Sequence, residues 1–155
     1  MSKVQAIIVT WNKKHDVLRL LENLREMDYP KEHLSIAVVD NHSTDGTAQA
    51  IESAFPDVTL IRNPENLGGA GGFNAGMRWA LAHRPEAEYL WLLDNDVLVD
   101  RNALKALVNV MQADPKAAIC GSKIMDIIHR HEMIEIGAFI NYRFGDIRRN
   151  EPSPE

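Results

Sequence analysis

The chain has 155 residues, of which 45% are hydrophobic, and it carries a formal net charge of −5 and one cysteine. This length and apolar content suffice for one compact domain with a buried core. The acidic balance, without a dense basic block, argues against general nucleic-acid binding. A single cysteine excludes an internal disulfide and is typical of a reducing cytoplasm, and no apolar run approaches the roughly 20 residues of a membrane span.

Strand-like and helix-like segments alternate through the first 120 residues. Helices are predicted by apolar residues at helical spacing from about Asp16 to Met27, from a cap at 43–45 to Phe55, from about Gly72 to His83, and from a cap at Asp100 to Asp114. Between them, apolar and β-branched runs predict strands at 4–10, 35–39, 58–61, 88–93 and 117–120. This order predicts an α/β fold with a Rossmann-like, mostly parallel sheet and helices on both faces.

The pattern changes after Cys120. Short strands or a meander are predicted at 123–128, 133–136 and 138–142, with a turn at 144–146. Residues 148–155 offer no apolar anchor and are predicted to be a disordered tail, which leaves 1–147 as the folded part.

Polar residues gather where the predicted strands end. Thr10 and Asn12 follow the first strand, Asp40 follows the second, a glycine-rich segment follows the third, and Asp94 and Asp96 close the fourth. The carboxyl ends of parallel strands share one edge of a sheet, and ligands bind beyond that edge. The sequence therefore predicts a binding site there.

Asp94 and Asp96 are spaced i, i+2, so an extended strand would place both carboxylates on one side. Two neighbouring carboxylates repel each other, so a cation between them would be favourable. Mg²⁺ or Mn²⁺ is the natural candidate, because these ions prefer oxygen ligands and can bridge to a diphosphate. The alternative is a polar strand end that runs into a helix cap.

The segment 66–76 contains five glycines and is predicted as a loop that leads into a helix at Gly72. Glycines let backbone N–H groups approach a phosphate closely, although the pattern is neither a P-loop nor the dinucleotide fingerprint. The alternative is a turn that permits tight packing of a helix on the sheet.

For Asp40, binding to a nucleoside and capping of the next helix are both open, while for Ser43, Thr44 and Asp45 capping is favoured.

Taken in order, Thr10–Asn12, Val38–Thr47, Asn66–Gly76 and Leu92–Asp96 closely resemble the motifs of the family-2 glycosyltransferases with the GT-A fold. The variant Gly-Gly-Ala-Gly-Gly-Phe-Asn is most similar to the bacterial rhamnosyl- and galactofuranosyl-transferase branch. The resemblance covers roughly residues 4 to 140, and four motifs in order are specific.

The resemblance implies an inverting transferase with a nucleotide-diphosphate-sugar donor, UDP- or dTDP-linked, and Mn²⁺ or Mg²⁺. It implies a cell-surface polysaccharide or a lipid-linked precursor as acceptor, and a location in the cytoplasm or at the inner face of the membrane. By position it implies a metal site at Asp94 and Asp96, with Asp96 favoured as the direct ligand. The residues implied to bind the nucleotide sugar are Thr10, Asn12, Asp40, Asn66, Gly68, Gly71, Gly72, Asn74, Asp94 and Asn95.

Members of this family usually place an acidic catalytic base well downstream, and no such motif follows here. The carboxylates Asp126, Glu132, Glu135 and Asp146 do not stand in a matching context. We therefore expect a chain truncated at its C-terminus, with the donor part present and the base outside it. Two alternatives are a non-catalytic nucleotide-binding or interaction module and a sugar-nucleotide nucleotidyltransferase; the absence of glycine after the first strand counts against the latter.

Overall fold

The computed structural model describes residues 1–126, 133–135, 138–141 and 146–149. These residues belong to two compact units, 1–102 and 103–155. Parts of the strands predicted at 123–128, 133–136 and 138–142, the turn at 144–145, Glu132 and the tail at 150–155 lie outside the described residues.

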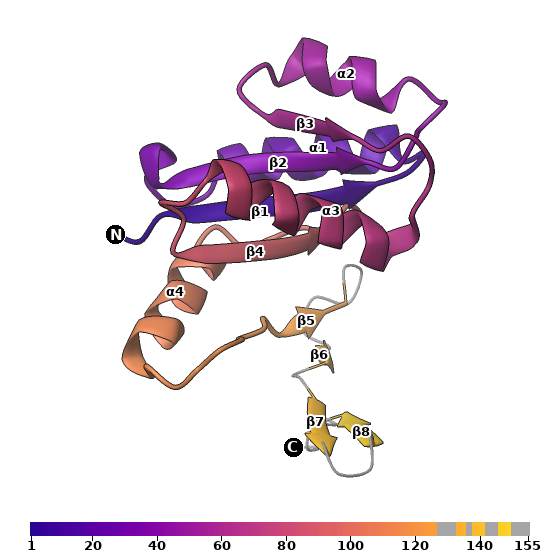
Figure 1. Ribbon diagram of the computed structural model, residues 1–155. Coiled ribbons are helices and arrows are strands. Elements are labelled where there is room, and N and C mark those ends of the chain that lie inside the picture. Colours follow the sequence, from indigo (N-terminus) through magenta and orange to yellow (C-terminus); the bar gives the residue numbers. More distant parts are fainter. Residues whose placement is uncertain (127–132, 136–137, 142–145, 150–155) are drawn as a thin grey trace. The chain divides into compact units, whose positions relative to one another are not determined.

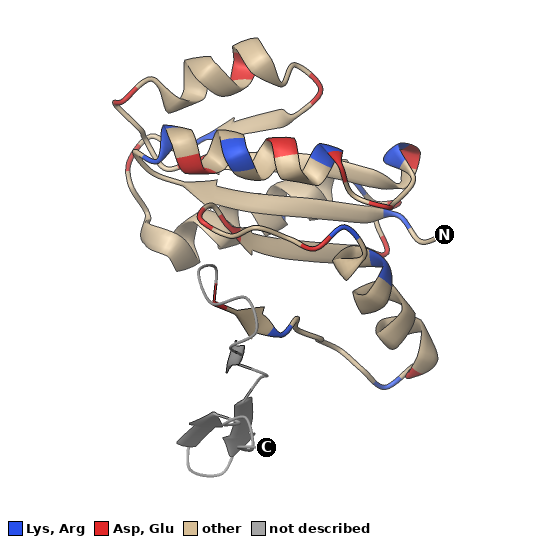
Figure 2. Cartoon of the chain, turned by 180° about the vertical axis from the view of Figure 1, so that it is seen from behind, with Lys and Arg blue, Asp and Glu red and all other residues tan. Residues whose placement is uncertain are grey.

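The first unit is a parallel sheet in the strand order β3-β2-β1-β4 (Figure 1), which confirms the predicted α/β fold. Helix α3 covers one face of the sheet and α1 the other, as the front and back views show (Figures 1 and 2). The elements are β1 (Val4–Thr10), α1 (Lys14–Arg25), the 3₁₀ turn η1 (Lys31–His33), β2 (Leu34–Asp40), α2 (Thr47–Ala54), β3 (Thr59–Arg62), α3 (Gly68–His83) and β4 (Tyr89–Asp94).

The core of this unit is centred on β1 and β2, the two inner strands. Ile7 and Ile8 point to opposite faces of β1 and are both fully buried, as expected for a strand covered on both sides. On α1 the apolar residues recur at helical spacing and line its buried side, so this helix is amphipathic: Val17, Leu20, Leu21 and Leu24.

The glycine-rich segment is part of α3, which begins at Gly68, so the predicted loop with a helix from Gly72 is wrong. Gly72 and Gly76 are buried against the sheet. A Cβ added at Gly76 would lie 2.5 Å from Ile7 Cγ2, and one at Gly72 would lie 2.5 Å from Val9 Cγ1. Tight helix–sheet packing, one of the two interpretations of this segment, therefore accounts for these two glycines.

Helix α2 begins at Thr47, with Gly46 at its N-cap in the left-handed region (φ 82°). Of the three residues predicted to cap this helix, Asp45 does so, because its carboxylate accepts a hydrogen bond of 3.0 Å from the backbone N–H of Thr47. Of the strands predicted up to residue 120, the one at 117–120 is wrong: those residues form no strand, and Ile119 is 90% exposed. That segment is too short and too lightly covered to bury its apolar side chains.

The described part of the second unit contains one helix and four short strands. Strand β5 pairs with β6 and β7 with β8, both antiparallel. Strand β8 includes Arg148 and Arg149, the first two residues of the predicted tail. None of the described helices is long and apolar enough to cross a membrane. The elements are α4 (Ala103–Ala113), β5 (Ile124–Met125), β6 (Met133–Glu135), β7 (Ala138–Asn141) and β8 (Asp146–Arg149).

We expect Gly76→Ala to lower the free energy of unfolding by about 1–3 kcal/mol, because the new methyl group overpacks Ile7 and Val39. Gly69→Ala is the matched control on the same helix, since nothing lies within 4 Å of a Cβ there and alanine favours helix. Urea denaturation of both variants measures the difference, and equal stabilities would contradict the close packing of α3.

Candidate functional site

The register of the sheet brings the predicted site residues to one edge. Thr10 pairs with Asp40, Asp40 pairs with Arg62, and Val9 pairs with Asp94, so strands β1 to β4 end together. Helix α3 follows β3 and also begins at this edge (Figure 1). Residues from four separate motifs are therefore neighbours in space, as the sequence predicted.

Thr10 and Asn95 link the end of β1 to the turn that follows β4. The Thr10 side chain is buried, and its hydroxyl oxygen accepts a hydrogen bond of 3.0 Å from the Asn95 amide nitrogen. This contact fixes the side chain of Asn95, which stands between the two acidic residues in the sequence. Asn95 therefore links the turn after β4 to strand β1.

Asp40 is buried at the end of β2. Its carboxylate accepts hydrogen bonds from the backbone N–H of Ser43, at 3.2 and 3.4 Å. Asp40 thus caps the start of the loop that follows β2. A carboxylate has further lone pairs, so this contact is compatible with an additional donor from a ligand.

Asn12 joins two loops of this edge in a left-handed backbone conformation (φ 50°). Its backbone N–H donates to the Ser43 hydroxyl at 2.9 Å, and its side-chain oxygen accepts from the backbone N–H of Thr44 at 2.8 Å. His42, in the second loop, has φ 65°. Non-glycine residues in this region carry strain of the kind that gathers at functional sites.

Asn41, which the sequence motifs did not single out, connects three elements. Its side chain is buried, donates to the carbonyl oxygen of Gly68 at 2.9 Å and accepts from the Asn63 amide at 2.7 Å. Its backbone N–H donates to the carbonyl of Thr10 at 2.9 Å. Its burial and its partners are set by the fold, so the sequence alone carried no signal that identified Asn41.

The first turn of α3 presents several of the other predicted residues. Asn66 accepts a hydrogen bond from the backbone N–H of Gly68 at 2.9 Å, and Gly68 has φ 68°. Gly71 packs against Leu67, since a Cβ there would lie 2.6 Å from the Leu67 Cβ. Asn74 is exposed. Gly72, by contrast, faces the sheet, so its role here is packing.

Strand β4 ends at Asp94, and Asn95 and Asp96 form a turn. The assumption that an extended strand aligns the two carboxylates is therefore wrong, although both are exposed at the carboxyl edge of the sheet. Within the described part of the chain, no group of three or more His, Cys, Asp or Glu residues could hold a metal ion. Two carboxylates supply hard oxygen ligands, so they fit a divalent cation that takes its other ligands from a diphosphate and water.

None of the four carboxylates considered as bases belongs to the first unit. Asp126 follows β5 in the second unit, and Glu132 lies outside the described residues. For Glu135 and Asp146 the structure gives only their places in β6 and β8.

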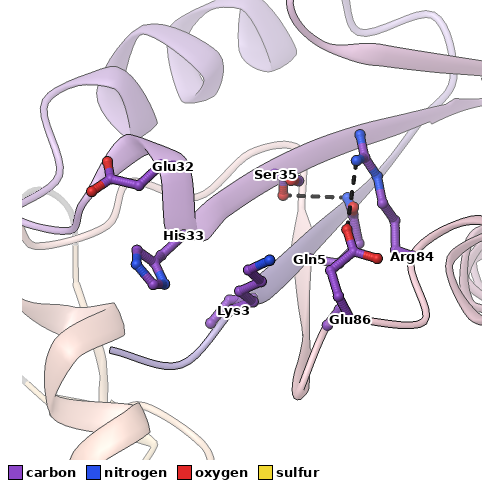
Figure 3. A pocket seen from close by; sticks show the side chains of 9 residues that line it. Lys3, Gln5, Glu32, His33, Ser35, Arg84 and Glu86 are labelled. Carbon is purple, nitrogen blue, oxygen red and sulfur yellow. Dashed lines mark hydrogen bonds and ion pairs between the residues drawn. The ribbon is translucent and has the colours of Figure 1, made fainter.

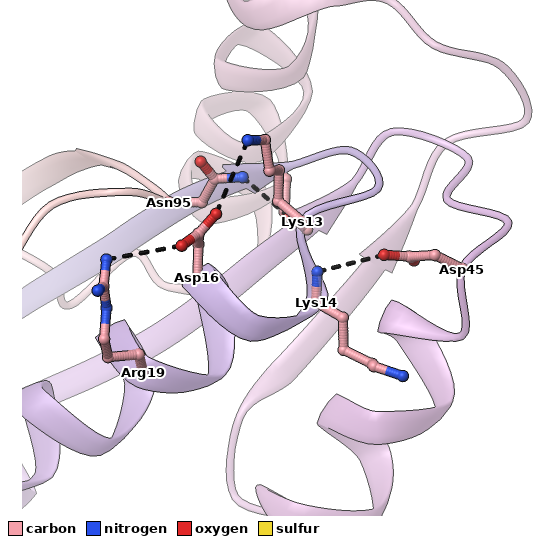
Figure 4. A network of polar contacts seen from close by, with 7 residues as sticks. Lys13, Lys14, Asp16, Arg19, Asp45 and Asn95 are labelled. Atoms are coloured by element: carbon pink, nitrogen blue, oxygen red, sulfur yellow. Dashed lines mark hydrogen bonds and ion pairs between the residues drawn. The ribbon is translucent and has the colours of Figure 1, made fainter.

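Exposed ion pairs lie within the start of α1, and a backbone contact links this start to the loop after β2 (Figure 4). Asp16 pairs with Lys13 at 3.8 Å and with Arg19 at 3.6 Å, and the backbone N–H of Lys14 donates to Asp45. Seen from behind, the ribbon of α1 carries acidic and basic residues in alternation along the helix (Figure 2). No large basic surface is needed to bind phosphate if backbone N–H groups and a cation do so.

Asp45 is held as a carboxylate by this arrangement. Desolvation acts to raise its pKa, but hydrogen bonds from the Thr47 hydroxyl and from the backbone N–H groups of Thr47 and Lys14 outweigh it. The pKa of Asp45 is therefore below its ordinary value of 3.8.

A small hollow lies at the opposite edge of the sheet, where β1 and β2 begin (Figure 3). Its volume is about 120 Å³, and the Gln5 side chain forms part of its wall while donating to the carbonyls of Ala6 and Ser35. Ligand sites of drug size usually measure about 300–1,000 Å³. The basic Lys3 and Arg84 are balanced by the acidic Glu32 and Glu86. This hollow is too small for a nucleotide sugar.

A parallel sheet whose strand ends bring together a helix start and two carboxylates belongs to the class of α/β folds that bind ligands beyond the carboxyl ends of their strands. Residues 5–153 match the model of the family described as "Glycosyl transferase family 2". The chain therefore belongs to the family-2 glycosyltransferases, as its motifs suggested.

Two relatives illustrate the sequence similarity. The poly(ribitol-phosphate) beta-N-acetylglucosaminyltransferase TarS of Staphylococcus aureus is 31% identical over 108 residues, which are 68% of this chain and 18% of TarS. The galactofuranosyltransferase GlfT1 of Mycolicibacterium smegmatis is 33% identical over 93 residues, 60% of this chain and 30% of GlfT1. The chain thus spans less than a third of these relatives.

Solved structures share the GT-A fold of this family. The mannosyltransferase PcManGT from Pyrobaculum calidifontis, in complex with GDP-Man and Mn²⁺, superposes with a TM-score of 0.66 at 33% identity, over 74% of this chain and 33% of that one. Residues 1–349 of S. aureus TarS in complex with UDP-GlcNAc give a TM-score of 0.62 at 22% identity, over 83% and 42% of the two chains, and support the fold alone.

We expect Asn41→Ala to lower the free energy of unfolding by about 2–4 kcal/mol, because it leaves the Asn63 amide and the Gly68 carbonyl without their buried partner. Asn41→Asp restores no stability, since its second oxygen faces the Gly68 carbonyl. The exposed Asn74→Ala serves as control in chemical denaturation. A neutral Asn41→Ala would contradict the connecting role of Asn41.

The lowered pKa of Asp45 predicts a contribution to stability that is complete above pH 3.8 and is lost as the pH falls through the folded-state value. Between about pH 5 and pH 3, the wild type should therefore lose more unfolding free energy than Asp45→Asn does. Glu65→Gln, which removes one exposed carboxylate, is the control for charge. Identical pH profiles for the wild type and Asp45→Asn would refute this account.

Proposed function

We propose that this chain is the donor-binding part of an inverting family-2 glycosyltransferase, which binds a nucleotide-diphosphate sugar at the carboxyl edge of the sheet. The observation that carries the proposal is the convergence at that edge of Thr10, Asp40, the start of α3 and the turn Asp94–Asp96. Scattered surface polarity has no physical reason to gather at one edge.

Each element has a role in this proposal. Thr10, Asn12 and Asp40 line the nucleoside pocket, where Asp40 accepts hydrogen bonds from ribose or base. The N-terminus of α3, with Asn66, Gly68, Gly71 and Asn74, borders the diphosphate and sugar. Free backbone N–H groups and the helix dipole favour negative charge at such a terminus.

Asp94 and Asp96 would hold a divalent cation, Mn²⁺ or Mg²⁺, with Asp96 as the direct ligand. The bound ion would supply neutralisation of the diphosphate leaving group as a Lewis acid. Asn95 contributes by fixing the turn to Thr10. The similarity to PcManGT, whose solved structure is a complex with GDP-Man and Mn²⁺, supports a metal-dependent donor site in this part of the fold.

For the sugar, we propose rhamnose or galactofuranose, linked to UDP or dTDP, and a cell-surface polysaccharide or lipid-linked precursor as acceptor. The similarity to the galactofuranosyltransferase GlfT1 and to the poly(ribitol-phosphate) transferase TarS supports these classes. The acceptor hydroxyl requires a general base on the opposite face of the sugar, and we assign none of the described residues to that role.

A non-catalytic nucleotide-binding or interaction module is the second candidate. The observation that favours it is that none of the four carboxylates considered as bases belongs to the first unit. A nucleotidyltransferase is less well supported, because Trp11-Asn12-Lys13 follows β1 in place of a glycine-rich loop.

Calorimetric titration of UDP, dTDP and GDP, with and without Mn²⁺, tests the donor site. We expect metal-dependent binding of one nucleotide by the chain, weakened at least about tenfold in Asp96→Ala. Asp114→Ala removes an exposed carboxylate at the end of α4 and should leave binding unchanged. Absence of binding by the folded chain would exclude the donor site and favour an interaction module that has no nucleotide site.

A further inference from the structure

The segment that follows the acidic turn is irregular, yet it is tied to the end of helix α1. Residues 97–100 form neither helix nor strand. The Asn23 side chain, in the last turn of α1, accepts a hydrogen bond from the backbone N–H of Val99 at 2.7 Å. Its amide nitrogen donates to the carbonyl of the same residue at 3.1 Å. One side chain thus satisfies both polar groups of Val99, as a neighbouring strand would.

Two further hydrogen bonds continue this contact. Arg101 Nε donates to the carbonyl of Glu26 at 3.0 Å, and the backbone N–H of Asp28 donates to the carbonyl of Arg101 at 2.9 Å. Val99 and Arg101 are therefore fixed to the end of α1 and the residues just after it.

The acidic turn is consequently held at both ends. On one side Asn95 donates to Thr10, and on the other Val99 is bound by Asn23. Only residues 96–98 lie between these two fixed points. Asp96 belongs to this short interval, so its main chain has little freedom to move away from Asp94.

This restraint matters because the two carboxylates repel each other and are exposed to solvent. An irregular segment without tethers would spread over many conformations, and a cation would have to order it at a cost in conformational entropy. Tethers formed before binding remove part of that cost.

We propose that Asn23 is a positioning residue, which holds the turn Asp94–Asp96 in the geometry that binds a divalent cation with a nucleoside diphosphate. The proposal rests on the function proposed above and extends it to a residue of α1 that lies outside the four sequence motifs. Asparagine suits the role because its short side chain carries one donor and one acceptor side by side.

The test compares Mn²⁺ affinity in the presence of UDP or another bound nucleotide, followed by the paramagnetic resonance signal of the free ion. We expect Asn23→Ala to weaken Mn²⁺ binding about tenfold, the lower range for residues that orient metal ligands. Asn23→Asp keeps the acceptor for the Val99 N–H but turns a second oxygen toward the Val99 carbonyl. Because these contacts are only part-buried, unlike those of Asn41, solvent relieves much of that repulsion, so the affinity should lie between those of Asn23→Ala and the wild type.

Arg25→Ala is the matched control, because Arg25 occupies the same turn of α1 but contacts a different region. It pairs with Asp57 at 2.9 Å and lies over the Phe55 ring at 4.2 Å. Its loss should lower stability without changing Mn²⁺ affinity. Amide exchange at Val99 gives a readout independent of the metal and should accelerate in Asn23→Ala but not in Arg25→Ala.

The outcomes separate the two proposals. If the wild type binds Mn²⁺ and nucleotide while Asn23→Ala binds them equally well, the positioning role is wrong and the donor site stands. If Arg25→Ala weakens Mn²⁺ binding as much as Asn23→Ala does, the effect reflects general stability and the role is again wrong. If the wild type binds neither, the donor site itself is excluded and the positioning role is excluded with it.

Discussion

The hydrogen bonds of Asn41 are the constraint on which the carboxyl edge depends. This buried amide joins the end of β2 to the start of α3 and to Asn63 after β3, and its backbone joins it to β1. Leaving a buried amide without a partner destabilises the fold by more than one hydrogen bond stabilises it. Separating β2, β3 or α3 from Asn41 is therefore unfavourable. The helix start and the strand ends are thereby held as one rigid group.

Close packing of α3 works together with this network. Gly72 and Gly76 allow the helix to lie against Val9, Ile7 and Val39 at distances that any side chain would prevent. The same close approach brings the first turn of the helix to Asn41. Because Gly72 and Gly76 have no side chain, the helix can approach the sheet closely enough to place its first turn beside Asn41. Asn66 and Gly68 set the backbone conformation at the exposed N-terminus of the helix.

Much of the first unit could be predicted from sequence because its signals are local. Strands β1, β2 and β4 are apolar runs, the helices show 3.6-residue periodicity, and parallel topology then gathers the polar strand ends. The conformation of residues 68–71 was missed because glycine has a low helix propensity, which tertiary packing overrides here. The strand expected at 117–120 is absent because a local apolar run is not sufficient for a strand. No neighbour among the described residues buries this run, and Ile119 stays exposed.

The roles of Asn41 and Asn23 could not be read from the sequence, because each depends on partners brought together by the fold. The contact of Thr10 with Asn95 joins residues 85 apart, and that of Asn23 with Val99 joins residues 76 apart. Contacts of such separation require the intervening chain to be present and its ends to be brought together. During synthesis the chain must therefore reach about residue 100 before both tethers of the acidic turn can form, and a shorter nascent chain has the loops after β1 and β2 without a turn tethered at both ends.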